Sequence, residues 1–184
     1  DQIVKANLIQ SRPLIQANLV ETNYNITGQG VGVCHLDTGV NYNHVNLAGA
    51  YRGGYDFVNN DPDPMDDHGH GTATAGVIAS NHSTRRGISP KVNLLAIKVL
   101  DSNGWGYSSG ITAGINWCIA NKNQYNISVI SMSFGTLNTY TPTTNPGYED
   151  PALQIAYNLN IVPVAGSGNG GSLIGIAYPA VSPH

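Results

Sequence analysis

Four short apolar runs are spread along the chain, and each one ends at turn residues. They cover residues 31–36, 92–99, 127–133 and 161–165. Runs of this length, bounded by Gly, Asn or Asp, are typical of buried strands. The hydrophobic pattern therefore predicts four strands.

Before and between these runs, apolar residues recur at the spacing of a helix. The pattern predicts helices over residues 14–20, 70–80 and 107–122, with a further one opening at Asp150-Pro151. The polar stretches 41–66 and 136–147 are predicted to be loops. Strands that alternate with helices in this way predict an α/β fold, with a parallel sheet covered on both faces.

Chemically useful residues follow three of the predicted strands. They are Asp37, the segment Ser133-Phe134-Gly135, and Gly168-Asn169. Each alone fits an ordinary turn residue. The carboxyl ends of parallel strands share one edge of the sheet, however, and ligands of such folds bind at that edge. The sequence therefore predicts a site there.

Two histidines, His68 and His70, lie where the predicted helix 70–80 begins. Small residues recur at helical spacing along that helix, at Thr72, Ala75, Gly76 and Ala79. A helix with such a bare face packs tightly on a sheet and would hold His70 rigidly at its start, which suits a general base.

Two alternatives to a general base stay open for these histidines. In the first, they are solvated loop residues without a role. In the second, they bind a metal with their acidic neighbours, the candidate ligands being Asp66, Asp67, His68 and His70. No second Cys/His cluster with zinc spacing supports the metal site.

The composition narrows the range of partners. Of 184 residues only 10% are charged and the net charge is −3. Without a basic patch to neutralise phosphates, neither nucleic acid nor an anionic membrane is expected as a partner. No apolar run is long enough to span a membrane.

The two cysteines, Cys34 and Cys118, both lie in apolar segments and do not make a disulfide framework, so we expect buried free thiols. Three glycosylation sequons, at Asn25, Asn81 and Asn126, would matter only in a secreted protein.

An Asp at a strand end, a His opening a helix and an Asn in a Gly-rich turn together suggest acyl-transfer machinery. Residues 33–40, 69–76 and 165–169, which contain Asp37, His70 and Asn169, resemble the motifs of the subtilisin-like serine proteases, the subtilases of peptidase family S8. The order Asp then His is that of this family. The resemblance implies that Asp37 orients the imidazole, His70 is the general acid and base, and Asn169 donates to the oxyanion.

The resemblance runs over residues 26–184 and implies a subtilisin-like three-layer sandwich, a mostly parallel central sheet with helices on both faces. Residues 1–25 form an N-terminal segment that could include the end of a propeptide. No Gly-Thr-Ser-Met-Ala-like segment with the family's serine occurs before His184. We therefore expect residues 26–184 to be a partial peptidase domain, truncated at its C-terminus, with the nucleophile beyond this chain and no activity alone.

The family also implies how a peptide substrate lies. It would run as an extended strand between Gly104-Trp105-Gly106 and Ser133-Phe134-Gly135, and main-chain hydrogen bonds would hold it. The pocket for the substrate residue before the scissile bond would have Ala165, Gly166 and Gly168 as its wall, with Ala177 near its base.

No cofactor is expected. A strong calcium site of many family members would need a carboxylate where this chain has Asn46, and the loop 81–87 is short, so we expect no tight calcium site there. A weak structural calcium in another loop stays open. The expected partners are a protein or peptide substrate and, as a candidate, a propeptide; the expected location is extracellular. The alternative function is that of a pseudo-protease, which binds peptides without cutting them.

Overall fold

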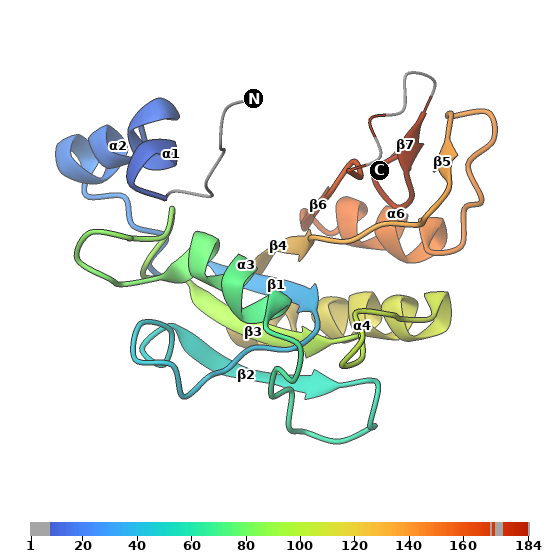
Figure 1. The fold of residues 1–184 in the computed structure, drawn as a ribbon, viewed down its shortest axis with the longest axis horizontal. Coiled ribbons are helices and arrows are strands. Elements are labelled where there is room, and N and C mark those ends of the chain that lie inside the picture. The colour runs from blue at the N-terminus through green and yellow to red at the C-terminus, as the bar shows by residue number, and fades with distance from the viewer. Residues whose placement is uncertain (1–7, 170, 172–174, 184) are drawn as a thin grey trace.

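A computed structural model describes residues 8–169, 171 and 175–183. A five-stranded sheet lies at its centre, in the order β2-β3-β1-β4-β6, and every neighbouring pair of strands is parallel (Figure 1). The strands are β1 Gly32–Asp37, β2 Tyr51–Asp56, β3 Asn93–Lys98, β4 Ile127–Met132 and β6 Val162–Ala165. The predicted α/β fold with a mostly parallel sheet is confirmed.

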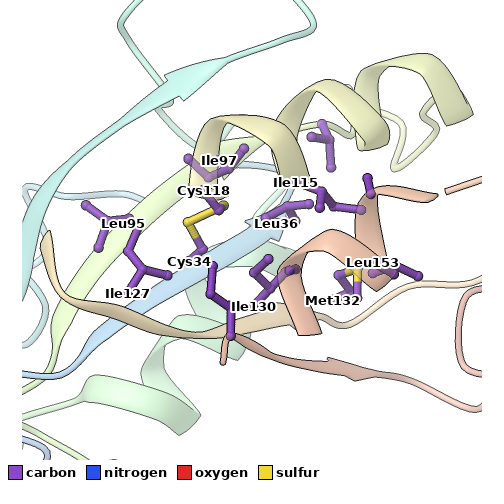
Figure 2. Close-up of a cluster of buried hydrophobic side chains, with 14 of the residues drawn as sticks. Cys34, Leu36, Leu95, Ile97, Ile115, Cys118, Ile127, Ile130, Met132 and Leu153 are labelled. Atoms are coloured by element: carbon purple, nitrogen blue, oxygen red, sulfur yellow. A yellow bond between two sulfur atoms is a disulfide. The ribbon is translucent and has the colours of Figure 1, made fainter. Parts of the chain in front are cut away.

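Helices cover both faces of the sheet. Helix α3 (His70–Ala79) lies on one face, and α4 (Ser108–Ala120) and α6 (Asp150–Asn158) pack on the other. Side chains along β1 alternate between the two layers. Leu36 joins Ile115 of α4 and Leu153 of α6 in one buried cluster (Figure 2), whereas Val33 packs with Ala75 of α3. These three layers place α3 directly against the strand that ends at Asp37.

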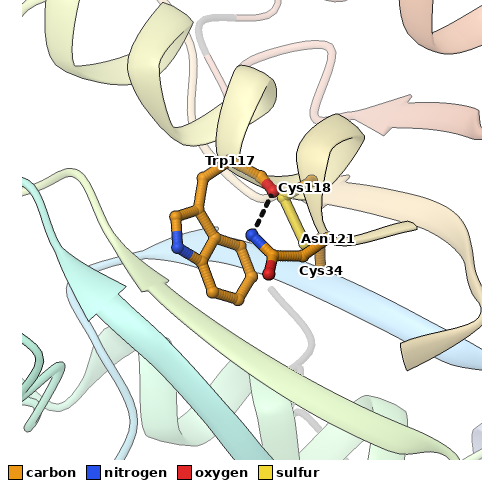
Figure 3. Close-up of a disulfide and its surroundings, with 4 residues drawn as sticks. All are labelled: Cys34, Trp117, Cys118 and Asn121. Carbon is orange, nitrogen blue, oxygen red and sulfur yellow. Dashed lines mark hydrogen bonds between the residues drawn. A yellow bond between two sulfur atoms is a disulfide. The ribbon is translucent and has the colours of Figure 1, made fainter. Parts of the chain in front are cut away.

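Cys34 of β1 and Cys118 of α4 are both fully buried, as expected. They are not free thiols, however, because a disulfide joins them across the layer (Figures 2 and 3), with Cα atoms 6.1 Å apart. In Figure 3 the Asn121 side chain lies beside this disulfide and donates a hydrogen bond of 2.9 Å to the Trp117 carbonyl. The prediction of free thiols was wrong because 84 residues separate the cysteines, and only the packing of α4 on β1 brings them together.

Two strands, β2 and β5, lie where the sequence predicted loops. Strand β2 is in the stretch 41–66, and its sequence Tyr-Arg-Gly-Gly-Tyr-Asp lacks an apolar run. It pairs closely with β3, since a Cβ at Gly54 would lie 1.8 Å from the Ala96 carbonyl oxygen. The second strand, β5 (Thr139–Tyr140), is in the predicted loop 136–147 and pairs antiparallel with β7 (Ile176–Ala177). Backbone pairing stabilises both in the absence of a strong hydrophobic pattern.

The N-terminal segment holds two helices, α1 (Leu8–Leu14) and α2 (Ala17–Tyr24), where one helix over 14–20 was predicted. Residues 1–7 lie outside the described part. Glu21 accepts hydrogen bonds from Arg12 and Arg86, and Arg12 also donates to the Gly87 carbonyl. The hydrogen bond from Arg86 in particular lowers the pKa of Glu21. Arg86 thus ties α2 to the connection that follows α3.

The short helix α5 (Lys122–Tyr125) leads into β4. In the described residues, every helix is too short or too polar to cross a membrane.

The register of the sheet brings three strand ends together. Leu36 is opposite Met132, and Met132 is opposite Ala165. Because β1, β4 and β6 run in the same direction, the residues that follow them leave the sheet at one edge. That edge carries Asp37, Ser133-Phe134-Gly135 and Gly168-Asn169, as the sequence predicted.

Candidate active site

The centre of the site is a contact between Asp37 and His70. His70 is the first residue of α3, and its Nδ1 lies 2.7 Å from Oδ1 of Asp37. The Asp37 side chain is completely buried, whereas that of His70 is 42% exposed. A buried carboxylate therefore holds one ring nitrogen, and the exposed ring leaves Nε2 accessible to another group.

Two further donors fix the carboxylate of Asp37. The backbone N–H of Thr38 donates to Oδ1 over 2.7 Å, and the hydroxyl of Thr74 donates to Oδ2 over 3.2 Å. Thr74 is one turn after His70 on α3. Both oxygens thus have protein donors, which is what a buried charge requires. The arrangement presents a charged, oriented carboxylate to His70.

Asp66 holds the loop that leads into α3. Its oxygens accept hydrogen bonds from the side chain of Thr38, from the backbone of His68 and Gly69, and from both the backbone and the hydroxyl of Thr72. Burial alone would raise the pKa of Asp66, but the hydrogen bonds from Thr72, Gly69 and His68 outweigh it and lower the pKa to about 2. The loop before His70 is therefore anchored to an ionised carboxylate.

A close backbone contact fixes the start of α3. A Cβ at Gly71 would lie 2.0 Å from the Gly39 carbonyl oxygen, so only glycine fits there. The N–H of Gly71 also donates to the Thr38 hydroxyl over 2.9 Å. His70 is consequently held against the turn that follows β1.

Lys98 supports the same turn from β3. It is almost fully buried, and its Nζ donates to the carbonyls of Thr38 and Leu100 and forms an ion pair of 2.6 Å with Asp67. These contacts keep the backbone beside Asp37 in place.

The contacts of Asp66 and Asp67 bear on the alternative of a metal site. Asp66 is occupied by backbone and hydroxyl donors, and Asp67 pairs with Lys98. His68 packs edge-on against His70, with ring centroids 6.3 Å apart. Among the described residues no three His, Cys, Asp or Glu side chains gather as metal ligands would. The geometry favours an Asp–His pair over a metal centre.

The two predicted substrate-binding segments border one cavity. A cavity of about 460 Å³ lies between Gly104-Trp105-Gly106 and Phe134-Gly135. A turn formed by Asp101 supports the first segment, since its Oδ1 accepts hydrogen bonds from the N–H groups of Asn103 and Trp105. Trp105 itself is 61% exposed. A Cβ at Gly104 would lie 3.4 Å from Nε2 of His68, so this segment runs beside the histidine loop.

A second cavity, of about 650 Å³, adjoins the first. Ser133, Gly166, Gly168, Asn169 and Ala177 line it, together with Phe134 and Gly135. Ala177 is buried between two glycines, because Cβ atoms built at Gly135 and Gly168 would lie 2.7 and 3.2 Å from its own Cβ. Of the residues predicted to form the wall of this pocket, only Ala165 does not line the cavity. It borders a smaller cavity together with Pro179.

The sequence alone did not point to three residues of this site: His35, Thr74 and Lys98. The sequence could have indicated Thr74, because it is four residues after His70 and therefore lies on the same face of the helix. For His35 and Lys98 the only signal was a polar residue inside a predicted buried strand, which does not say what the side chain contacts.

Residues 28–184 match the family model of the Subtilase family. Alkaline serine exoprotease A of Vibrio alginolyticus is 40% identical over 144 residues, which are 73% of this chain and 26% of that protein. Serine protease AprX of Bacillus subtilis is 37% identical over 179 residues, 89% of this chain and 39% of the relative.

A crystal structure of a cold adapted subtilisin-like serine proteinase is 34% identical and superposes with a TM-score of 0.63, covering 79% of this chain and 49% of that one. The chain thus spans about half or less of the length of these relatives. The family match over residues 28–184, with these identities and this fold, shows that the chain belongs to the subtilase family.

Proposed function

We propose that the full-length protein is a serine endopeptidase in which Asp37, His70 and Asn169 act with a serine that follows residue 184. The observation that carries the proposal is the 2.7 Å contact between Nδ1 of His70 and the buried carboxylate of Asp37. The pair supplies an oriented base, and such a base is what the hydroxyl of a serine nucleophile needs.

The reaction follows from the tautomer of His70 that carries its hydrogen on Nδ1. With its Nδ1–H donated to Asp37, the neutral imidazole has a free lone pair on Nε2, which takes the proton of the serine as its oxygen attacks the peptide carbonyl. Asp37 stabilises the imidazolium that results, and the same Nε2–H then protonates the leaving amine. The side-chain amide of Asn169 would donate to the developing oxyanion.

The substrate is proposed to be an extended peptide. Its backbone would pair with Gly104-Trp105-Gly106 and Ser133-Phe134-Gly135, and the residue before the scissile bond would enter the cavity that Gly166, Gly168 and Ala177 line. Ala165 lies outside that cavity and would affect its wall only by supporting the neighbouring residues. A pocket with so little side-chain bulk would accept large apolar residues.

Peptide hydrolysis by the full-length protein tests this function. We expect His70→Ala to lower kcat by at least about 10³-fold, the contribution of a positioned acid and base. His68→Ala is the matched control, since it removes the neighbouring imidazole and should keep most of the activity. Wild-type activity in His70→Ala would refute the role. A full-length protein that binds peptides without cutting them would establish the pseudo-protease instead.

We also propose that no tight calcium site lies at Asn46. Its backbone carbonyl already accepts a hydrogen bond from Asn81, and an amide supplies no charge to the cation. Calorimetric titration of the full-length protein with calcium should show no tight binding that depends on Asn46, so wild type and Asn46→Ala should give the same result. Stoichiometric binding lost in that variant would contradict the proposal.

An extracellular location is proposed on the disulfide between Cys34 and Cys118. Disulfides persist in oxidising compartments and are rare in the cytosol. The propeptide remains a candidate partner, and a pull-down of the folded protease with any segment that the full-length protein carries before Asp1 would test it.

A further inference from the structure

A buried imidazole, His35, lies near Oδ2 of Asp37, whereas His70 contacts the other carboxylate oxygen, Oδ1. The proposed reaction makes no use of it. His35 is two residues before Asp37 on β1 and is completely buried. Its Nε2 lies 3.1 Å from the Gly71 carbonyl oxygen, 3.0 Å from the Thr74 hydroxyl and 3.7 Å from Oδ2 of Asp37.

The contact with Gly71 determines the tautomer of His35. A carbonyl oxygen only accepts, so Nε2 carries the hydrogen. The other nitrogen, Nδ1, is buried and has no hydrogen-bond partner in the part of the chain that the structure describes. A proton on Nδ1 would therefore find no acceptor. Burial lowers the pKa of His35, although the charge of Asp37 works in the opposite direction. The ring is thus a neutral and fixed N–H donor.

This donor controls the hydroxyl of Thr74. An oxygen that accepts the Nε2–H of His35 keeps its own hydrogen for another acceptor. The acceptors in reach are Oδ2 of Asp37 at 3.2 Å and the carbonyls of His70 and Gly71 at 3.0 and 3.1 Å. Helical Thr hydroxyls usually donate back to such carbonyls. Here the single Nε2–H of His35 is shared between the Gly71 carbonyl and the Thr74 oxygen, and for the Thr74 hydroxyl a carboxylate is a stronger acceptor than either carbonyl.

We propose that His35 and Thr74 are a positioning pair, in which the imidazole N–H directs the Thr74 hydroxyl onto Oδ2 of Asp37 so that Oδ1 stays aimed at His70. The inference rests on the proposed endopeptidase function. The titratable groups near His35 are Asp37, His70 and Asp66. The strand neighbours of His35 are Ala96 on β3 and Ser131 on β4, and both are uncharged.

Four variants of the full-length protein test the pair. Thr74→Val removes the hydroxyl and keeps the shape, whereas Thr74→Ser keeps the hydroxyl. His35→Leu removes the donor, whereas the amide of His35→Gln can place an N–H near the position of Nε2. We expect Thr74→Val and His35→Leu to lower kcat roughly tenfold, the effect of one hydrogen bond to a charged group. Thr74→Ser and His35→Gln should remain within about threefold of wild type on the same scale.

Three readouts separate positioning from a loss of folded protein. Titration with a serine-directed sulfonyl fluoride gives kcat per active site, and KM should not change, since neither residue contacts substrate. The double variant His35→Leu/Thr74→Val should be no worse than Thr74→Val alone, because both act through one hydroxyl. The proton NMR resonance of His70 Nδ1–H should move upfield in Thr74→Val and stay in place in Thr74→Ser.

The outcomes are distinguishable. An active wild type with unchanged kcat and an unchanged proton resonance in Thr74→Val would overturn the inference and leave the proposed function intact. A wild type that cuts no peptide would refute the function, and the NMR comparison of the Thr74 variants would still decide whether the Thr74 hydroxyl holds Asp37. If His35→Leu does not fold, the matched pair Thr74→Val and Thr74→Ser carries the test.

Discussion

Asp37 and Asp66 both accept hydrogen bonds at the start of α3, but they serve different partners. Asp37 is buried and holds the ring of His70. Asp66 is partly exposed and holds the backbone before His70 through His68, Gly69 and Thr72. One carboxylate therefore orients the imidazole, and the other orders the loop that carries it.

The second role predicts a pH-dependent loss of stability in Asp66→Asn. The amide NH₂ would face the two donors of Thr72 and lose those bonds. The pKa of Asp66 is lowered from 3.8 to about 2, so its stabilisation is complete above about pH 4 and disappears as the pH falls towards 2. We expect a deficit of about 1 kcal/mol at neutral pH, after allowance for solvent screening.

Thermal unfolding of full-length wild type and Asp66→Asn checks this. The Tm of the variant should be lower at pH 6, and the difference should shrink near pH 2. An equal difference at both pH values would show that the charge of Asp66 does not contribute.

Helix α3 is held in position by close backbone contacts. It has only ten residues and a face of small side chains, and its position depends on backbone contact rather than on large apolar groups. The sequence predicted this helix within one residue of its end, because the small residues repeat at helical spacing. Strand β2 escaped prediction, because its place beside β3 depends on Gly54 and on pairing that no local pattern records.

Two glycines of α3 give a matched test. A Cβ at Gly71 would meet the Gly39 carbonyl, whereas a Cβ at Gly76 has open space. Gly71→Ala should lower the free energy of unfolding by roughly 1–3 kcal/mol, and kcat with it, since His70 moves. Gly76→Ala should raise stability by about 0.5–1 kcal/mol through a better helix propensity. Denaturant unfolding and peptide hydrolysis measure both; equal effects in the two variants would contradict the close contact.

The disulfide acts at the scale of the whole molecule. It joins the central strand to α4 and closes a separation of 84 residues. Restricting the unfolded chain over such a loop stabilises the folded protein by about 2–4 kcal/mol. The double variant Cys34→Ala/Cys118→Ala should therefore lose about 2–4 kcal/mol of its free energy of unfolding and unfold at a lower Tm.

Because both cysteines are fully buried, reduction should require unfolding. In the wild-type protein, a thiol reagent with a mild reductant should label these cysteines only in denaturant. Labelling of the native protein would show that the layer between β1 and α4 opens.

The sequence by itself determined the alternation of strands and helices, and with it the edge at which Asp37, Ser133-Phe134-Gly135 and Asn169 leave the sheet. Such information is local, because the periodicity of side chains and the turn residues lie within a few positions of one another. The motifs around Asp37 and His70 are local in the same sense.

Only the tertiary structure decided the partners of side chains that are distant in sequence. Cys34 meets Cys118, Lys98 holds the turn after Asp37, and His35 reaches Thr74 on another element. These contacts depend on how α3 and α4 pack on the sheet. Packing is a property of the whole molecule, because each buried polar group must find its partner among all the elements that surround it.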